Sequence, residues 1–230
     1  MSVSKNNWDF HVEKMDKHHF GGKQIEEVIN RLTTQAWYNN SLQILDFGCG
    51  TGRFARELVQ KGAESVHGVD VESKMIEFAK AKVEESGYQD RISLQHLEKL
   101  DASELDADKY DCVVSLTVFG HVRGGDYSEV FANVVKSLKV GGYLVISEFK
   151  NFDHSIFHDP IFAEDHMQEH ATKIQEGHHA HDHVSDGGHH HTQFNEEIWT
   201  QLAQDNNMEV VCLEEYFNNK LNFFIAKRNQ

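Results

Sequence analysis

Two acidic residues and three glycines in the first third of the chain have the types and spacing of a nucleotide-binding turn. Asp46 precedes Gly48, Gly50 and Gly52 in the stretch DFGCGTG, and Asp70 follows in HGVD, 22 residues after Gly48. Glycine lets a backbone approach a ligand closely, and an acid at the end of a second strand can accept both hydroxyls of a ribose. These residues predict a nucleotide-like ligand. The alternative is that the glycines serve only a turn and Asp70 only caps the next helix.

The flanking residues predict the strand, tight turn and helix that would position this site. The apolar run Ile44, Leu45 and Phe47 ends at the glycines, as a short strand does. Apolar residues then recur at helical spacing up to Gly62, namely Phe54, Ala55, Leu58 and Val59. The start of such a helix offers free N–H groups and a positive dipole end to a ligand.

The glycine spacing separates two kinds of nucleotide site. Dinucleotide folds prefer G-x-G-x-x-G, whereas this chain reads G-x-G-x-G, with Arg53 where the last glycine would stand. The stretch LDFGCGTG resembles the first motif of the class I S-adenosylmethionine-dependent methyltransferases. That resemblance implies that Asp46 lies near the methionine end of the cofactor and that Asp70 takes the ribose hydroxyls. It implies cofactor contacts for Gly48, Cys49 and Gly50 as well.

The resemblance extends along most of the chain and implies further cofactor contacts. VDVESKMIEFAKAKV looks like the second strand and helix, with Val71 on the adenine and Met75 also at the cofactor. Helical spacing independently predicts that Met75, Ile76, Ala79 and Val83 face the sheet. RISLQHLEKLD resembles the third strand, with Leu97 and Glu98 at the adenine or, alternatively, Asp101. In KYDCVVSLTVFGHV, which resembles the fourth strand and its loop, Ser115 and Leu116 would lie near the sulfonium.

The expected fold is α/β: a Rossmann-like, three-layer α/β/α domain around a seven-stranded, mostly parallel sheet with an antiparallel C-terminal strand. SLKVGGYLVISEF matches the fifth strand, and two strands are expected in MEVVCLEEYF and KLNFFIAKR. Asn195 is the expected cap of the helix before them. Residues 1–230 then form one domain, with 1–41 as an N-terminal helical lid and 150–193 as a His-rich insertion before the last helix. In such folds ligands bind at the carboxyl ends of the strands, so the insertion would lie over the substrate side.

Methyl transfer needs few catalytic side chains, because the sulfonium is already a strong electrophile and positioning supplies most of the rate. His121 follows the expected fourth strand and is the candidate for orienting or deprotonating an acceptor. The alternative for His121 is a structural histidine bonded to a nearby carbonyl. The stretch DKHHFGG, residues 16–22, is expected either to fold over the cofactor or to form a solvated turn.

The histidine tract EGHHAHDHVSDGGHHH raises metal binding as a second function. Neutral imidazoles suit Zn²⁺, Ni²⁺ or Cu²⁺, and the candidate ligands are His178, His179, His181, His183, His189, His190 and His191. A solvated loop with incidental affinity is the alternative. HMQEH at 166–170 matches a zinc-peptidase pattern, but it falls in an acidic insertion rather than in a peptidase framework.

Composition limits the substrate classes and the cellular compartments that we expect. The formal net charge is −15 with only 22 Lys and Arg, so nucleic acid is a poor substrate. No apolar run approaches the roughly 20 residues of a membrane helix. Three well-separated cysteines and the lack of a leader-like opening favour a cytoplasmic protein. We therefore expect a methyltransferase acting on a small-molecule acceptor, or alternatively a metal-binding or metal-buffering protein on the same frame.

Overall fold

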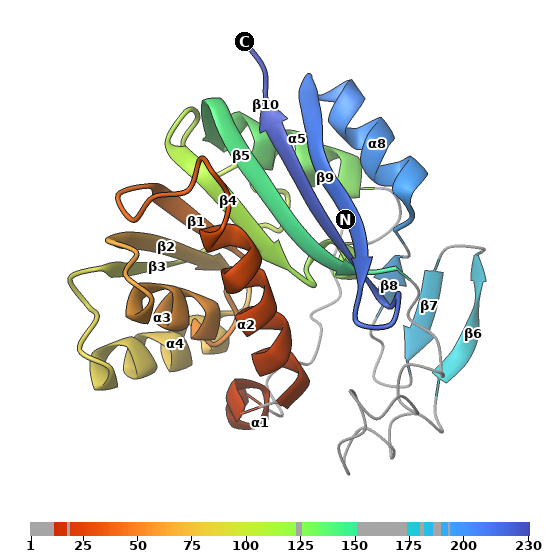
Figure 1. Cartoon of the computed structure of the whole chain (residues 1–230). Coiled ribbons are helices and arrows are strands. Elements are labelled where there is room, and N and C mark those ends of the chain that lie inside the picture. Colours follow the sequence, from red (N-terminus) through yellow and green to blue (C-terminus); the bar gives the residue numbers. More distant parts are fainter. Residues whose placement is uncertain are drawn as a thin grey trace.

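The computed structural model of the chain describes residues 12–17, 19–122, 126–150, 174–179, 182–185, 190–192 and 194–230. Within 13–15, 19–20 and 174–192 the description is limited to the backbone. The main body is a seven-stranded sheet with the order β3-β2-β1-β4-β5-β10-β9 (Figure 1). Its strands are β1 Gln43–Phe47, β2 Ser65–Asp70, β3 Ile92–His96, β4 Tyr110–Leu116, β5 Leu138–Phe149, β9 Met208–Tyr216 and β10 Leu221–Arg228.

The pairing directions confirm the predicted topology. Strands β1 to β5 pair in parallel, and β10 is antiparallel to both of its neighbours, β5 and β9. The parallel strands need crossover helices, because a tight turn cannot return the chain to the same edge. All the parallel strands therefore place their carboxyl ends on one edge of the sheet, where ligands bind in open α/β folds.

Helices cover both faces of the sheet and give the three layers (Figure 1). They are α1 Val12–Lys17, α2 His19–Thr33, α3 Arg53–Gln60, α4 Ser73–Glu85, α5 Tyr127–Ser137 and α8 Glu196–Asp205. Helices α2 and α3 pack on one face with Val83 of α4, and α5 and α8 pack on the other. The four residues of α4 predicted to face the sheet, Met75, Ile76, Ala79 and Val83, are all buried. Asn195 caps α8 as predicted, with its side chain accepting the amide of Ile198.

The N-terminal region is helical, but α2 is part of the core. Val28, Ile29 and Leu32 are 0–1% exposed and belong to the cluster that also contains α3 and strands of the sheet. Apolar residues at this spacing form one buried stripe on a helix, and that stripe fixes α2 to the sheet. A lid function stays a prediction for the residues ahead of this stripe. There, Asp16 pairs with Arg56 of α3 at 2.5 Å.

The region between β5 and α8 contains strands that the sequence patterns did not predict. Strands β6 Ile174–His179, β7 Asp182–Ser185 and β8 His190–Thr192 pair in the order β6-β7-β8. Backbone contacts bring β8 against the short 3-10 helix η2, Phe119–His121, which follows β4. Part of the His-rich region thus lies beside the turn that holds His121. Among the described helices, none is long and apolar enough to cross a bilayer.

Candidate functional site

The glycine turn joins β1 to α3 at the carboxyl edge of the sheet. Gly48, Gly50 and Gly52 have φ values of 77°, 50° and 69°, in the left-handed region that favours glycine. The amides of Gly48 and Cys49 both donate to the Val69 carbonyl at 2.9 Å. The turn is therefore fixed to the end of β2 by its own backbone.

Two of these glycines have different surroundings. A Cβ added at Gly50 would meet no atom within 4 Å, so this side of the turn faces open space. A Cβ added at Gly48 would lie 2.2 Å from Cγ2 of Val118, the residue just before η2. Gly50 thus leaves room for a ligand, whereas Gly48 lets the turn that follows β4 pack closely on the glycine turn.

Asp70 ends β2 and bonds to two backbone amides. Its Oδ2 accepts from Gly50 N at 2.8 Å, and its Oδ1 accepts from Glu72 N at 2.9 Å. Burial of the carboxyl group raises its pKa, and these amides act in the opposite direction. Each carboxylate oxygen can accept a second hydrogen bond. The N-cap of α4 is Glu72, without a side-chain capping bond, so Asp70 is not itself the N-cap residue of that helix.

Asp46 is a buried acid with an unsatisfied oxygen. The residue is 2% exposed, and its Oδ2 has no hydrogen-bond partner among the described residues. Burial raises its pKa to about 8, the charge of Asp70 adds to the rise, and the amide of Ala55 in α3 opposes it. A buried carboxylate oxygen without a partner costs free energy unless a ligand supplies a donor. The ammonium and sulfonium groups of S-adenosylmethionine fit this acidic pair in charge.

The residues predicted for the adenine side have diverse environments. Val71 is partly buried against the core cluster of that face, and Leu97 is 1% exposed with its amide bonded to the Asp70 carbonyl. Glu98 is exposed. The carboxylate of Asp101 is occupied by the backbone and hydroxyl of Ser103. Met75 is 3% exposed and faces the sheet, as its helical spacing predicts. Cofactor contacts for these residues stay predictions.

The residues predicted for the acceptor side follow one another along β4 and η2. Ser115 is fully buried, and its Oγ has no hydrogen-bond partner within the described ranges. Leu116 ends β4 and is partly buried. His121 ends η2, also partly buried, and its amide donates to the Val118 carbonyl at 3.0 Å. Methyl acceptance at this edge stays a prediction for all three.

Two buried polar groups at the end of β5 were not predicted. Glu148 is 1% exposed and accepts the Gly120 amide of η2 at 3.1 Å. On the other side of β5, Ser147 accepts from Gln24 Nε2 at 2.7 Å and bonds to the Tyr216 hydroxyl. A charged residue between Ser147 and Phe149, near the end of the otherwise apolar stretch YLVISEF, is the signal that would have singled out Glu148.

The predicted metal ligands lie in the backbone-only part of the chain. His181 and His189 are outside the described residues, whereas His178, His179, His183, His190 and His191 lie in β6, β7 and β8. Strand pairing sets His183 opposite His191. Where side chains are described, no group of three His, Cys, Asp or Glu could hold a metal ion. Metal binding therefore stays a prediction.

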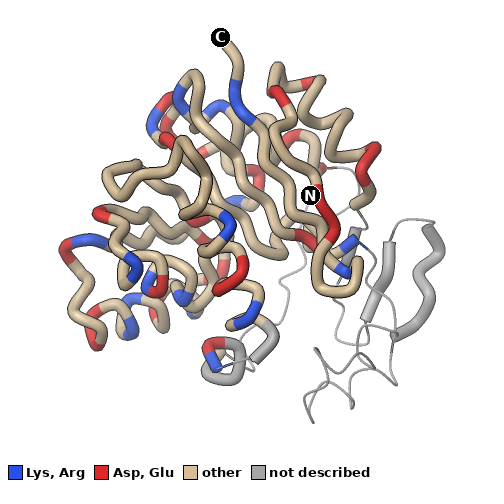
Figure 2. The backbone as a smooth tube through the Cα atoms, in the orientation of Figure 1, with Lys and Arg blue, Asp and Glu red and all other residues tan. Residues whose placement is uncertain are grey.

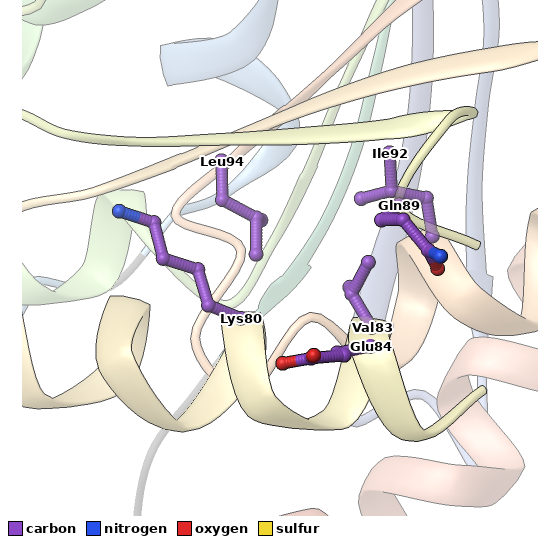
Figure 3. A pocket seen from close by; sticks show the side chains of 6 residues that line it. All are labelled: Lys80, Val83, Glu84, Gln89, Ile92 and Leu94. Atoms are coloured by element: carbon purple, nitrogen blue, oxygen red, sulfur yellow. The ribbon is translucent and has the colours of Figure 1, made fainter. Parts of the chain in front are cut away.

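A pocket of about 370 Å³ lies elsewhere, between α4 and the edge strand β3. Figure 3 shows Ile92 and Leu94 pointing from β3 toward α4, and Val83 pointing back from the helix. Lys80, Glu84 and Gln89 complete the lining. The pocket is separate from the acids and glycines at the carboxyl edge, so we do not assign the cofactor to it.

Comparisons with known proteins agree with this geometry. Residues 44–142, from β1 to the start of β5, match the family described as "Methyltransferase domain". The chain is 32% identical over 149 residues to the ubiquinone biosynthesis O-methyltransferase of Rickettsia akari, covering 63% of this chain and 55% of that protein. It is 30% identical over 110 residues to the ribosomal protein L11 methyltransferase of Shewanella piezotolerans, covering 48% and 34%. The chain thus spans between a third and just over half of these relatives.

A solved structure extends the likeness beyond the matched region. Magnesium protoporphyrin IX methyltransferase from Synechocystis, with bound S-adenosylmethionine, aligns over 99% of this chain and 87% of its own, with a TM-score of 0.65 and 19% identity. At 19% identity, this structural similarity is evidence for the fold alone. The evidence for the family is the sequence match from β1 to the start of β5. Because that sequence contains the glycine turn and Asp70 on the expected sheet, residues 44–142 form a class I S-adenosylmethionine-dependent methyltransferase domain.

Proposed function

We propose that the protein transfers a methyl group from S-adenosylmethionine directly to a small-molecule acceptor. The observation that carries the proposal is a pair of acids, buried Asp46 and partly buried Asp70, around a turn whose Gly50 faces open space. When bound, the cofactor would supply an electrophilic methyl group on its sulfonium. The protein then has to bind the cofactor, orient the acceptor and exclude water.

The acids and the turn have separate binding tasks in this proposal. Asp70 is held by the amides of Gly50 and Glu72, so its remaining lone pairs are aimed without a further loss of side-chain freedom. These lone pairs would accept the two ribose hydroxyls. Asp46 would accept a donor from the methionine end with its unpartnered Oδ2. The left-handed glycines would let the chain pass close to the ligand, and the first amides of α3 would face it as donors.

His121 would act on the acceptor. It ends η2 at the carboxyl end of β4, one residue after the amide that Glu148 accepts. An imidazole there would orient the acceptor and, when the acceptor carries a proton, take that proton as the methyl group arrives. A thioether or tertiary amine acceptor would need only orientation.

Charge distribution supports a small acceptor over nucleic acid. Along the described backbone, Lys and Arg positions are interspersed with Asp and Glu positions (Figure 2). A phosphate backbone would meet a formal net charge of −15. The two relatives bear names of a ubiquinone-pathway enzyme and a ribosomal-protein enzyme, so a protein acceptor is the alternative that the experiment has to separate.

The test combines a measurement of cofactor binding with a measurement of product formation. Calorimetry with S-adenosylhomocysteine should give saturable binding to the parent and about tenfold weaker binding to Asp70→Ala. Formation of S-adenosylhomocysteine from the methyl donor should then be measured with phenols, carboxylates, amines and thiols, and separately with purified ribosomal proteins. Turnover with a small compound supports the proposal. Binding without turnover on any small compound, together with turnover on a protein, would replace it.

A further inference from the structure

Glu148 is buried beneath the turn that joins β4 to the acceptor side. It is the next-to-last residue of β5 and is 1% exposed. Its Oε2 accepts the Gly120 amide at 3.1 Å, and its Oε1 accepts the Phe149 amide at 3.0 Å. The amides of Val118 and Phe119 also favour its ionised form. One carboxylate therefore faces several consecutive amides at the start of η2.

These amides are the ones that a short helical turn leaves without partners of its own. The first N–H groups of a helix have no acceptor within it, and Val118, the N-cap of η2, makes no side-chain capping bond. Glu148 supplies the missing acceptor from a different strand, and a carboxylate forms stronger bonds to amides than a neutral group does. Glu148 thus caps η2 through tertiary structure.

The strand that holds Glu148 is fixed on both sides. β5 pairs with β4 as far as Ser147, and Glu148 lies opposite Asn222 of β10. Asn222 is itself 3% exposed and donates to the Phe194 carbonyl at 2.6 Å. The carboxylate is therefore presented from a rigid support, and the turn after β4 is the part that it can hold in place.

The turn in question, Val118–Val122, touches both halves of the proposed site. Val118 packs on the glycine turn so closely that Gly48 admits no Cβ, and His121 ends the same turn. Resting on the proposed function, we infer that Glu148 is a positioning residue that holds Val118–Val122, and with it His121, in register with the cofactor loop.

Ionisation of Glu148 gives the inference a pH signature. Burial raises the pKa of Glu148 to about 7, and the amides oppose that rise. Protonation removes acceptor capacity from the carboxyl group, so the turn should loosen as pH falls through about 7 and tighten above it. On the packed elements, the titratable residues are His121 of η2 and, on β8 beside η2, His190 and His191, whereas Thr117 after β4, Asn222 of β10 and Phe194 before α8 do not titrate in this range.

The experiment measures hydrogen exchange of individual amides together with kinetics, using Glu148→Gln and, as a matched control, Ser147→Ala. Ser147 is equally buried one residue earlier on β5 but bonds to Gln24 and Tyr216 on the opposite face. Glu148→Gln should reduce protection at Val118–Gly120 by about tenfold and remove the change in protection near pH 7. Ser147→Ala should lower the melting temperature without either effect. Equal protection in Glu148→Gln and parent, or an equal loss along all of β4 and β5, would overturn the inference.

Kinetic measurements distinguish a failure of this inference from a failure of the proposed function. With an acceptor that the parent methylates, Glu148→Gln should lower kcat by about tenfold and leave the KM for S-adenosylmethionine within about twofold. An unchanged kcat despite a loosened turn would refute the positioning role. A parent that binds S-adenosylhomocysteine but methylates nothing would count against the proposed function, and the exchange data would still decide whether Glu148 holds the turn.

Discussion

Cofactor affinity should rise with pH through Asp46, because this buried carboxyl group must ionise to receive a cationic ligand. Burial and the charge of Asp70 raise the Asp46 pKa to about 8, so the ligand-free protein holds it protonated over most of the neutral range. A bound ammonium or sulfonium favours the ionised form and lowers that pKa. Binding at pH 6 to 7 therefore has to release a proton from Asp46.

The size of the effect follows from this pKa. If the ligand binds only the ionised form, affinity should increase by about tenfold from pH 6 to pH 7 and flatten above about pH 8. The stability of the ligand-free fold should change with pH in the opposite direction. A carboxyl pKa raised from 3.8 contributes stability that is full at low pH and is lost as pH rises through about 8. The melting temperature of the ligand-free protein should thus fall over the range in which affinity grows.

The assay is calorimetry with S-adenosylhomocysteine at pH 5.5 to 7.5, in two buffers with different ionisation enthalpies. At pH 6.5 the parent should release about one proton per ligand bound. The ammonium of the ligand stays charged below about pH 8, so it does not contribute in this window. Asp46→Asn keeps the shape of the side chain, and it should bind more weakly and with no dependence on pH. An affinity that is independent of pH in the parent, or equally dependent in Asp46→Asn, would refute the assignment of Asp46.

Four further outcomes follow from the site. Asp70→Ala should weaken S-adenosylhomocysteine by at least about tenfold, since the ribose hydroxyls lose their acceptor; equal affinities by calorimetry would contradict this. Gly50→Val should fold with a lowered melting temperature, because the added Cβ meets no atom within 4 Å but a φ of 50° is unfavourable for a β-branched residue, and it should fail to bind the ligand. Gly48→Ala should lower the melting temperature more than Gly87→Ala, which has a similar φ but open space around its Cβ; the reverse order would exclude close packing of the two turns. Deleting Gly177–His190 should leave ligand affinity within about twofold and abolish Zn²⁺ uptake, and loss of both would show that the tract belongs to the active site.

The sequence determined the order and type of the core elements, because their signals are local. Apolar residues at helical spacing gave α3 and α4, and short apolar runs that end at glycine or acid gave β1 and β2. Asn195 marked the start of α8 for the same reason, since a capping side chain bonds to an amide only three residues away. The resemblance of LDFGCGTG to a known first motif then indicated the methyltransferase family.

The three-dimensional packing decided what these residues touch. The amide that binds Asp70 comes from Gly50, and the side chain that requires a glycine at position 48 comes from Val118, which follows another strand. Neither partner is evident from a pattern along the chain, because each depends on how two parallel strands are aligned. The place of α2 within 1–41 depended on packing in the same way. Whether its apolar stripe covers a ligand or the sheet depends on the surface that it meets, and it meets the sheet, while a lid function of the residues ahead of it stays a prediction.

The partners of Glu148 depend on tertiary packing more than those of any other residue discussed above. A single acid near the end of an apolar strand gives no local sign of the turn that it holds, because the Gly120 amide that its Oε2 accepts lies 28 residues earlier in the chain. Gln24 and Ser147 are joined across 123 residues in the same way. The sequence by itself determined which elements form and which cofactor the turn suits. Only the assembled sheet decided which buried polar groups meet at its carboxyl edge, because those bonds join strands and turns that lie far apart in the chain.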